Sequence, residues 1–247
     1  MRLWLPVMTL CQRELVRFWR EKGRVLGLVA SPLVFWLLIG SGYGNLGFFF
    51  PGALVLTVMF SAISSTITII EDRREGFLLS MLVSPAPRSS MVLGKILGST
   101  VLAWLQGIIF LLFAPLVGFR ITLASGLGLL GALFLVCFAF TALGFLLAWQ
   151  MESSQGFHVV MNLLLMPMWM VSGSLFPITN AHAWIRYVMW ANPMTYSVVV
   201  IRWLLEPQAA APGPGVTLSV IVTAGFALIL WLFSSILATR KTLRSFA

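Results

Sequence analysis

Charged residues are scarce in this sequence. Asp, Glu, Lys and Arg make up 9% of its 247 residues, and only seven residues are acidic. A soluble globular domain carries about 25% charged residues, so this composition excludes a soluble catalytic domain. Hydrophobic residues make up 60% of the chain and occur in long runs. The sequence therefore predicts an all-α integral membrane protein, because helices satisfy their own backbone hydrogen bonds inside lipid.

Cysteines and catalytic motifs are also few. The two cysteines, Cys11 and Cys137, lie far apart in the sequence, so they support neither a disulfide framework nor a metal site. No phosphate-binding Gly-x-x-x-x-Gly-Lys-Ser/Thr loop occurs: Gly94-Lys95 lacks the first glycine, and Ile96 follows the lysine. We therefore expect no metal, no cofactor and no nucleotide hydrolysis in this chain.

Six apolar runs are each long enough to cross a bilayer, which takes about 20 residues. They are 25–43, 48–70, 96–118, 121–149, 157–176 and 216–238, and they predict a six-span transmembrane domain over 25–239. Of the 16 Lys and Arg residues, all except Arg120, Arg186 and Arg202 fall on the side that holds the N-terminus. The positive-inside rule then predicts that both termini are cytoplasmic, including the basic tail 240–247. Membrane orientation thus explains the net charge of +9 without a nucleic-acid partner.

The segment 1–24, ahead of the first span, is basic and amphipathic. Phe18 and Trp19 lie on its apolar helical face, and Arg13 and Arg17 lie on the opposite face. This pattern predicts a helix in the membrane interface, with its aromatic side chains at the level of the lipid headgroups. A solvated basic tail is the alternative, and the regular apolar stripe argues against it.

The densest charge cluster in the middle of the chain lies in the predicted cytoplasmic loop 71–90, between the second and third spans. It reads Glu71-Asp72-Arg73-Arg74-Glu75-Gly76-Phe77. A short helix can begin at Asp72, where carboxylates complement the positive end of the helix dipole. Its apolar stripe would consist of Leu78, Met81, Leu82 and Pro85. Such a helix at a membrane face lies on lipid or docks into a partner, and an ordinary solvated loop is the alternative.

The stretch 177–207 follows the fifth span on the predicted outer side. It is too apolar for a solvated loop, and its prolines interrupt it too often for a regular span. We predict a pair of short re-entrant helices that enter the outer leaflet, because irregular backbone at that depth must be buried in protein or line a cavity. The alternative is a seventh span over 178–203, which would place the C-terminal basic cluster outside, against the charge bias.

Three stretches, in order along the chain, share a pattern with one family of transport proteins. The first is Arg13-Glu14-Leu15-Val16-Arg17-Phe18-Trp19-Arg20 followed by Ser31-Pro32. The second is Arg73-Arg74-Glu75-Gly76 followed by Leu82-Val83-Ser84-Pro85 and Gly94-Lys95. The third is Ser172-Gly173-Ser174-Leu175-Phe176-Pro177 followed by Trp184, Asn192-Pro193-Met194-Thr195-Tyr196 and Arg202. Together they resemble the membrane subunit of ABC type-2 exporters, the permeases of drug-resistance, nodulation and polysaccharide export.

The resemblance implies a homodimer of six-span permease subunits in a bacterial cytoplasmic membrane. Each subunit would rest on a separate ABC-type ATP-binding subunit, which carries the ATP and magnesium. The implied coupling helix on that ATPase comprises Glu71, Asp72, Arg73, Arg74, Glu75, Gly76, Phe77, Leu78, Met81, Leu82 and Pro85. The implied outer re-entrant gate comprises Phe176, Pro177, Trp184, Asn192, Pro193 and Tyr196. Phe77 departs from the family, where Thr is common, and makes the coupling surface more apolar.

Two other classes of membrane protein fit the sequence less well. A membrane enzyme needs ionisable residues clustered at one depth, and a secondary transporter or channel usually carries ionisable residues inside its spans. The predicted spans are almost free of them. The same absence favours an amphiphilic or lipidic substrate, such as a drug, a lipid or a glycan, over a free ion.

Overall fold

A computed structural model describes residues 4–20, 22–77, 87–207 and 213–244, and these residues form helices and turns without a β-strand. The elements in chain order are α1 (Trp4–Arg20), α2 (Lys22–Gly42), α3 (Leu46–Ser65), α4 (Thr68–Arg74), α6 (Arg88–Leu111), η1 (Ala114–Val117), α7 (Leu123–Gln150), α8 (Ser154–Trp169), η2 (Met170–Ser174), η3 (Ile178–Asn180), α9 (Ala183–Ala191), α10 (Pro193–Leu205) and α11 (Val216–Arg244).

The described residues include five helical stretches that are long and apolar enough to cross a membrane. They are Leu46–Arg74, Arg88–Val117, Leu123–Gln150, Ser154–Ser174 and Val216–Ala238. Two shorter apolar helices, Ala30–Gly42 and Pro193–Leu205, accompany them. The prediction of a multi-pass helical membrane protein is confirmed at this level. The first predicted span, 25–43, coincides with α2 to within a few residues, and the shorter stretch Ala30–Gly42 is its described apolar part.

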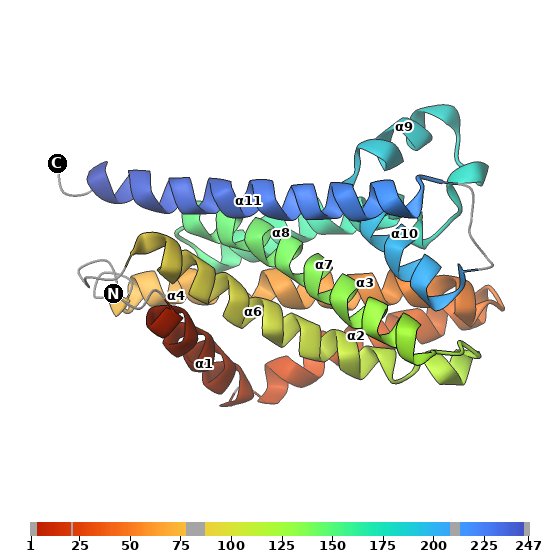
Figure 1. Cartoon of the computed structure of the whole chain (residues 1–247), viewed down its shortest axis with the longest axis horizontal. Coiled ribbons are helices and arrows are strands. Elements are labelled where there is room, and N and C mark those ends of the chain that lie inside the picture. Colours follow the sequence, from red (N-terminus) through yellow and green to blue (C-terminus); the bar gives the residue numbers. More distant parts are fainter. Residues whose placement is uncertain (1–3, 21, 78–86, 208–212, 245–247) are drawn as a thin grey trace.

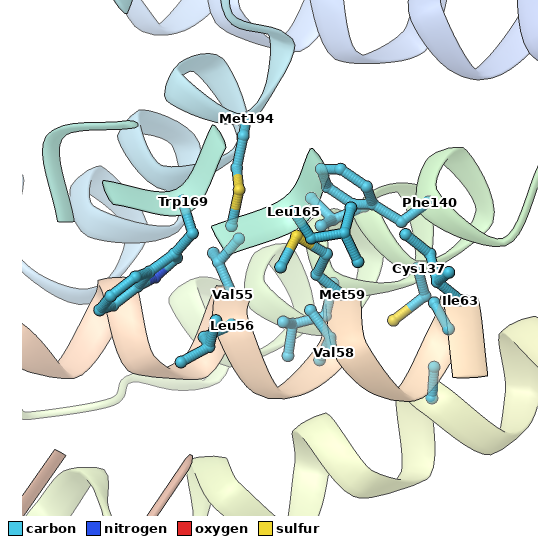
Figure 2. Close-up of a cluster of buried hydrophobic side chains, with 14 of the residues drawn as sticks. Val55, Leu56, Val58, Met59, Ile63, Cys137, Phe140, Leu165, Trp169 and Met194 are labelled. Carbon is cyan, nitrogen blue, oxygen red and sulfur yellow. The ribbon is translucent and has the colours of Figure 1, made fainter. Parts of the chain in front are cut away.

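The helix α3 forms the centre of the bundle. The apolar stretch of Leu46–Arg74 is 94% buried, whereas that of Val216–Ala238 is 22% buried. A helix that is apolar on all sides suits a position surrounded by other helices. Figure 2 shows Val55, Met59 and Ile63 of α3 among side chains from α7, α8 and α10. The bundle is thus organised around the second predicted span.

The two ends of the bundle carry different elements. In Figure 1, α1, α4 and the C-terminal end of α11 lie at one end, on the left of the view. The short helices α9 and α10 lie at the opposite end. The N-terminal helix, the segment after the second predicted span and the end of the last helix therefore share one end of the bundle.

The short helix does not begin at Asp72, where the sequence predicted its start. Asp72 lies inside α4, which begins at Thr68 and ends at Arg74, and Gly76 follows with a φ of +75°. Burial extends further than predicted, because Asp72, two residues past the predicted second span, is fully buried. The hydroxyl of Thr66 bonds to the Ile63 carbonyl in the turn that separates α3 from α4. The predicted apolar stripe, Leu78, Met81, Leu82 and Pro85, lies outside the described residues.

The third predicted span also starts earlier than expected. Its helix, α6, begins at Arg88, whereas the predicted span begins at residue 96, so Lys95 lies inside the helix. The last helix continues to Arg244, through part of the predicted basic tail. Both shifts have one cause: hydropathy marks only the apolar run, whereas a helix continues past the end of that run when no breaking residue intervenes.

The segment between α8 and α11 contains two short helices, α9 and α10, as predicted. Asn192 separates them with extended backbone, and its Oδ1 accepts a hydrogen bond from Met194 N at 3.0 Å. Pro193 occupies the first position of α10, where its missing N–H costs nothing. The alternative of one continuous span over 178–203 is wrong, because the chain breaks at this cap.

Candidate functional site

Asp72 is the centre of a cluster of ionised side chains at the α1 end of the bundle. Its carboxylate is fully buried. Arg13 of α1 donates to both of its oxygens, from Nη2 to Oδ1 at 2.8 Å and from Nη1 to Oδ2 at 3.1 Å. Arg17 Nη1 donates to Oδ1 at 3.1 Å, and Lys95 Nζ of α6 donates to Oδ2. One carboxylate of α4 therefore holds cations from two other helices.

Glu14 is the second buried acid of this cluster, with 2% of its surface exposed. Its Oε1 accepts from Lys95 Nζ at 2.7 Å, and its Oε2 accepts from Thr68 Oγ1 at 3.1 Å. Lys95 is itself 4% exposed and bridges the two carboxylates. Buried charges are tolerated when they are paired and hydrogen-bonded in this way.

Glu71 completes the cluster through Arg17, whose Nη2 lies 2.7 Å from Glu71 Oε2. We call the six residues the α1–α4–α6 charge cluster: Arg13, Glu14, Arg17, Glu71, Asp72 and Lys95. Its formal charges balance, with three cations against three carboxylates. The hydrogen bond to Asp72 raises the pKa of the Arg13 guanidinium, so this side chain stays ionised. The cluster fixes the segment after the second span to the N-terminal helix.

Close helix packing brings α1 to this position. A Cβ at Gly98 of α6 would lie 3.0 Å from Glu14 Cβ, and a Cβ at Gly94 would lie 3.1 Å from Val7 Cα. Two glycines four residues apart form a small-residue groove that lets helix backbones approach. The spacing of Gly94 and Gly98 is visible in the sequence and could have predicted that another helix packs on α6.

The outer face of α1 is apolar and exposed. Trp4, Leu5 and Met8 are 68%, 64% and 69% exposed, whereas Val7 and Leu10 are buried toward α6. This face is suited to lipid, and the interfacial position of α1 stays a prediction. The side chains of Phe18 and Trp19, also predicted for the interface, lie outside the described residues.

Arg73 and Arg74 bind the backbone of the loop between α7 and α8. Arg73 donates to the carbonyls of Trp149 at 2.7 Å and Met151 at 3.0 Å, and Arg74 donates to that of Glu152 at 2.9 Å. Carbonyls at the end of a helix have no partner within that helix, and cations complement this end of the dipole. The two arginines thus join α4 to the end of α7.

The other predicted coupling residues lie nearer the surface. Glu75 is 61% exposed, and its Oε1 lies 3.8 Å from Arg17 Nη2. The ring of Phe77 lies 3.8 Å from the Arg13 guanidinium carbon, a cation–π contact. Most of the predicted coupling residues that are described therefore make internal contacts, namely Glu71, Asp72, Arg73, Arg74 and Phe77. Glu75 is the acid most accessible to a partner.

At the opposite end, α8 finishes in the wide turn η2. Trp169 Nε1 donates to the Gly52 carbonyl of α3 at 2.8 Å, and Ser172 Oγ donates to the Trp169 carbonyl at 2.6 Å. Gly173 adopts a φ of +85°. A Cβ at Gly52 would lie 2.5 Å from Ser174 Cβ, so this turn packs directly on the α3 backbone.

The predicted outer residues fall into two groups. Asn192 Nδ2 donates to the Met168 carbonyl at 2.6 Å, and Tyr196 Oη donates to the Trp190 carbonyl at 2.7 Å. These bonds join α8, α9 and α10, with Pro193 at the junction and Phe176 and Pro177 partly buried after the turn. Trp184 is separate from this group: it lies on α9 and is 64% exposed.

In the sequence, Arg202 of α10 stands out only as the last residue of the third stretch that resembles the exporter family. Its Nη2 donates to the Gly173 carbonyl at 3.1 Å and the Phe48 carbonyl at 3.3 Å. The guanidinium carbon lies 4.6 Å from the Phe48 ring centre. Arg202 therefore ties α10 to the wide turn and to the start of α3. Among the described residues, no group of three or more His, Cys, Asp or Glu side chains could hold a metal ion.

Comparison with known proteins agrees with this arrangement. A profile of the ABC-2 type transporter family matches residues 6–205. The chain is 26% identical over 209 residues to the transport permease ycf38 of Cyanophora paradoxa, covering 79% of this chain and 72% of that protein. It is 26% identical over 231 residues to nodulation protein J of Sinorhizobium fredii, covering 89% and 87%.

A further relative is the multidrug ABC transporter permease YbhR of Escherichia coli strain K12. It is 24% identical over 158 residues, which cover 63% of this chain and 42% of that protein. The family match covers both the charge cluster and the wide turn. The chain belongs to the ABC-2 type transporter family, as a membrane permease subunit whose ATPase is a separate subunit.

Proposed function

We propose that this permease subunit acts as a homodimer of six-span subunits, with both termini cytoplasmic, in a bacterial cytoplasmic membrane. In this arrangement α2 supplies the first span, and α9 and α10 form the outer re-entrant segment. The positive-inside distribution of Lys and Arg supports the orientation. The placement of α1, α4 and the end of α11 at one end of the bundle supports it as well.

The observation that carries the proposed mechanism is the α1–α4–α6 charge cluster. The segment 71–85 contacts the ATPase, and ATP binding moves that contact. Because Asp72 accepts hydrogen bonds from Arg13, Arg17 and Lys95, displacement of α4 moves α1 and α6 with it. The cluster residues therefore position the coupling segment, while Glu75 and the apolar stripe from Leu78 to Pro85 meet the partner.

The outer residues form the gate of the pathway in this proposal. Phe176 and Pro177 follow the wide turn, and Asn192, Pro193 and Tyr196 lie where α8, α9 and α10 are joined. Trp184 lies on the exposed face of α9. In this proposal its ring lies at the level of the lipid headgroups, where amphipathic aromatic rings are enriched. A substrate would pass between the two subunits and leave where this segment opens.

The substrate in this proposal is amphiphilic or lipidic. The described helices carry few ionisable side chains between the two ends of the bundle, which disfavours a free ion. The names of two relatives refer to multidrug transport and to nodulation, which is consistent with export of an amphiphile.

The proposal is tested by purifying the tagged chain in mild detergent and measuring its partner stoichiometry and vanadate-sensitive ATP hydrolysis. We expect one ATP-binding subunit per permease chain. Met81→Asp should lose that partner, because it places a charge in the apolar stripe. Leu116→Asp, at a 79% exposed leucine on the opposite end, is the matched control and should retain it.

A homo-oligomer that co-purifies with no ATPase would contradict the proposed coupling and favour a secondary transporter or channel. Equal partner binding by the Met81→Asp and Leu116→Asp variants would show that the stripe is not the contact.

A further inference from the structure

A cavity of about 270 Å³ lies beside Arg202, at the end of the bundle that carries α9 and α10. The wide turn contributes Ser172 and Gly173 to its wall, α10 contributes Arg202 and Trp203, and Val216 opens α11 on the far side. Among the described residues of this lining, Arg202 is the one that carries a full charge. The cavity therefore combines a guanidinium with mostly apolar walls.

The guanidinium of Arg202 is only partly satisfied by the protein. Nη2 makes its two hydrogen bonds to backbone carbonyls, and Nε is buried without a partner. No carboxylate among the described residues forms an ion pair with Arg202. Glu206, four residues further along, is exposed at the end of α10. Glu206 thus offers Arg202 only a solvent-exposed counter-charge without a direct ion pair, and a partly buried cation compensated so weakly is costly, so an anionic ligand would stabilise it.

A second cavity adjoins the first. It has a volume of about 350 Å³ and lies between α7, α10 and α11. Trp203 and Val216 line both cavities. The walls of the second are almost entirely apolar, and Gly131 of α7 leaves open space there, since a Cβ at that position would meet nothing within 4 Å. A cationic cavity thus opens next to an apolar groove.

We propose that the two cavities together bind one membrane phospholipid from the leaflet at the α9 and α10 end. Its phosphate accepts hydrogen bonds from Arg202, because a guanidinium presents several donors that match phosphate oxygens. One acyl chain lies along Gly131 in the groove. A free anion would satisfy Arg202 but would leave the adjoining groove empty, so an amphiphile fits both cavities better.

This site is separate from the proposed coupling mechanism. It shares no lining residue with a third cavity between α2, α3 and α8, and it lies at the opposite end from the charge cluster. A phospholipid bound there would fasten α10 to α7 and α11. Its binding needs no ATP, so failure of this proposal and failure of the coupling proposal can be told apart.

The test measures the phospholipid that stays bound to the full-length protein. The protein is reconstituted with phosphatidylglycerol, extracted and washed in mild detergent, and analysed by native mass spectrometry. We expect one retained phospholipid per subunit. Arg202→Gln should lower the retained fraction on the order of tenfold, because charge-assisted hydrogen bonds to the phosphate are lost.

Gly131→Phe provides a second variant that leaves the hydrogen bonds of Arg202 intact. The added ring fills the groove and should lower retention by a similar factor. Arg186→Gln, on exposed α9, is the charge control. Gly225→Phe, where a Cβ also meets nothing within 4 Å, is the control for added bulk. Both controls should retain phospholipid as the parent chain does.

Three results would overturn the proposal. The first is a parent chain that retains no phospholipid. The second is unchanged retention in either Arg202→Gln or Gly131→Phe, since the proposal requires both cavities. The third is saturable binding of inorganic phosphate together with no retention of phosphatidylglycerol, which would make the cavity a small-anion site.

Discussion

Replacing Lys95 by Met should destabilise the protein through Glu14. Lys95 Nζ lies 2.7 Å from Glu14 Oε1 and also bonds to Asp72. Asp72 keeps Arg13 and Arg17 after the change. Glu14 keeps only the hydroxyl of Thr68 and a long contact of 3.4 Å to Arg13. The substitution therefore leaves one buried carboxylate largely uncompensated.

The cost can be estimated from this geometry. Breaking a buried ion pair by removing one partner costs about 3–5 kcal/mol. The lower end applies here, because Glu14 keeps two weaker contacts, so we expect about 3 kcal/mol. For a chain of this length, each kcal/mol moves the unfolding midpoint by about 2–4 °C. Lys95→Met should then lower the midpoint by roughly 6–12 °C.

The assay is thermal unfolding of the detergent-solubilised protein, followed by the change in tryptophan fluorescence. The double variant Lys95→Met with Glu14→Gln should recover about 2 kcal/mol, because it removes the uncompensated charge. Arg120→Met, at an exposed arginine, is the control and should change the midpoint little. A Lys95→Met midpoint within about 2 °C of the parent would refute the reasoning, as would strictly additive losses in the double variant.

Three further predictions concern the contacts that hold the two ends of the bundle. Gly98→Leu should separate α1 from α6, and so lower both the unfolding midpoint and ATP hydrolysis in the complex. Gly225→Leu is the control and should change neither. Equal behaviour of the two variants would contradict close packing of α1 on α6. Arg73→Gln should remove two charged hydrogen bonds to the Trp149 and Met151 carbonyls, worth about 1.5–3 kcal/mol each. Protease cleavage in the loop between α7 and α8 should then be faster. An unchanged cleavage rate would show that Arg73 does not hold this loop. Trp169→Phe should lose the bond to the Gly52 carbonyl and cost about 0.5–1.5 kcal/mol in chemical denaturation; no measurable loss would mean that the bond contributes nothing net.

The membrane-spanning helices could be predicted from hydropathy, because each long apolar run must satisfy its backbone within itself. A break between two helices near Asn192 could also be predicted, since a proline such as Pro193 is common at the first position of a helix. The start of α4 could not be predicted, because the chain is apolar on both sides of the turn at Thr66 and hydropathy does not mark that turn. Side-chain bonding in that turn decides it.

The charge cluster could not be derived from spacing alone. Glu14, Asp72 and Lys95 come from three separate segments, and only the packing of α1 on α6 brings them together. Each was visible as a charge near an apolar run, which is a signal of function or pairing. The sequence assigned Asp72 to a partner surface, whereas its neighbours in the fold already bind it.

The contacts at the two ends of α8 have a mechanical consequence. Arg74 holds the Glu152 carbonyl just before α8, and Asn192 holds the Met168 carbonyl in its last turn. Between these anchors the helix runs for 16 residues, a length of about 24 Å. One face of α8, with Phe157, Leu165 and Trp169, is buried in the core, and Trp169 Nε1 bonds to the Gly52 carbonyl, so the helix is held along its length. In the proposed mechanism α8 therefore joins the two ends of the bundle as one rigid unit, so that a shift of the α4 segment would displace the wide turn as well.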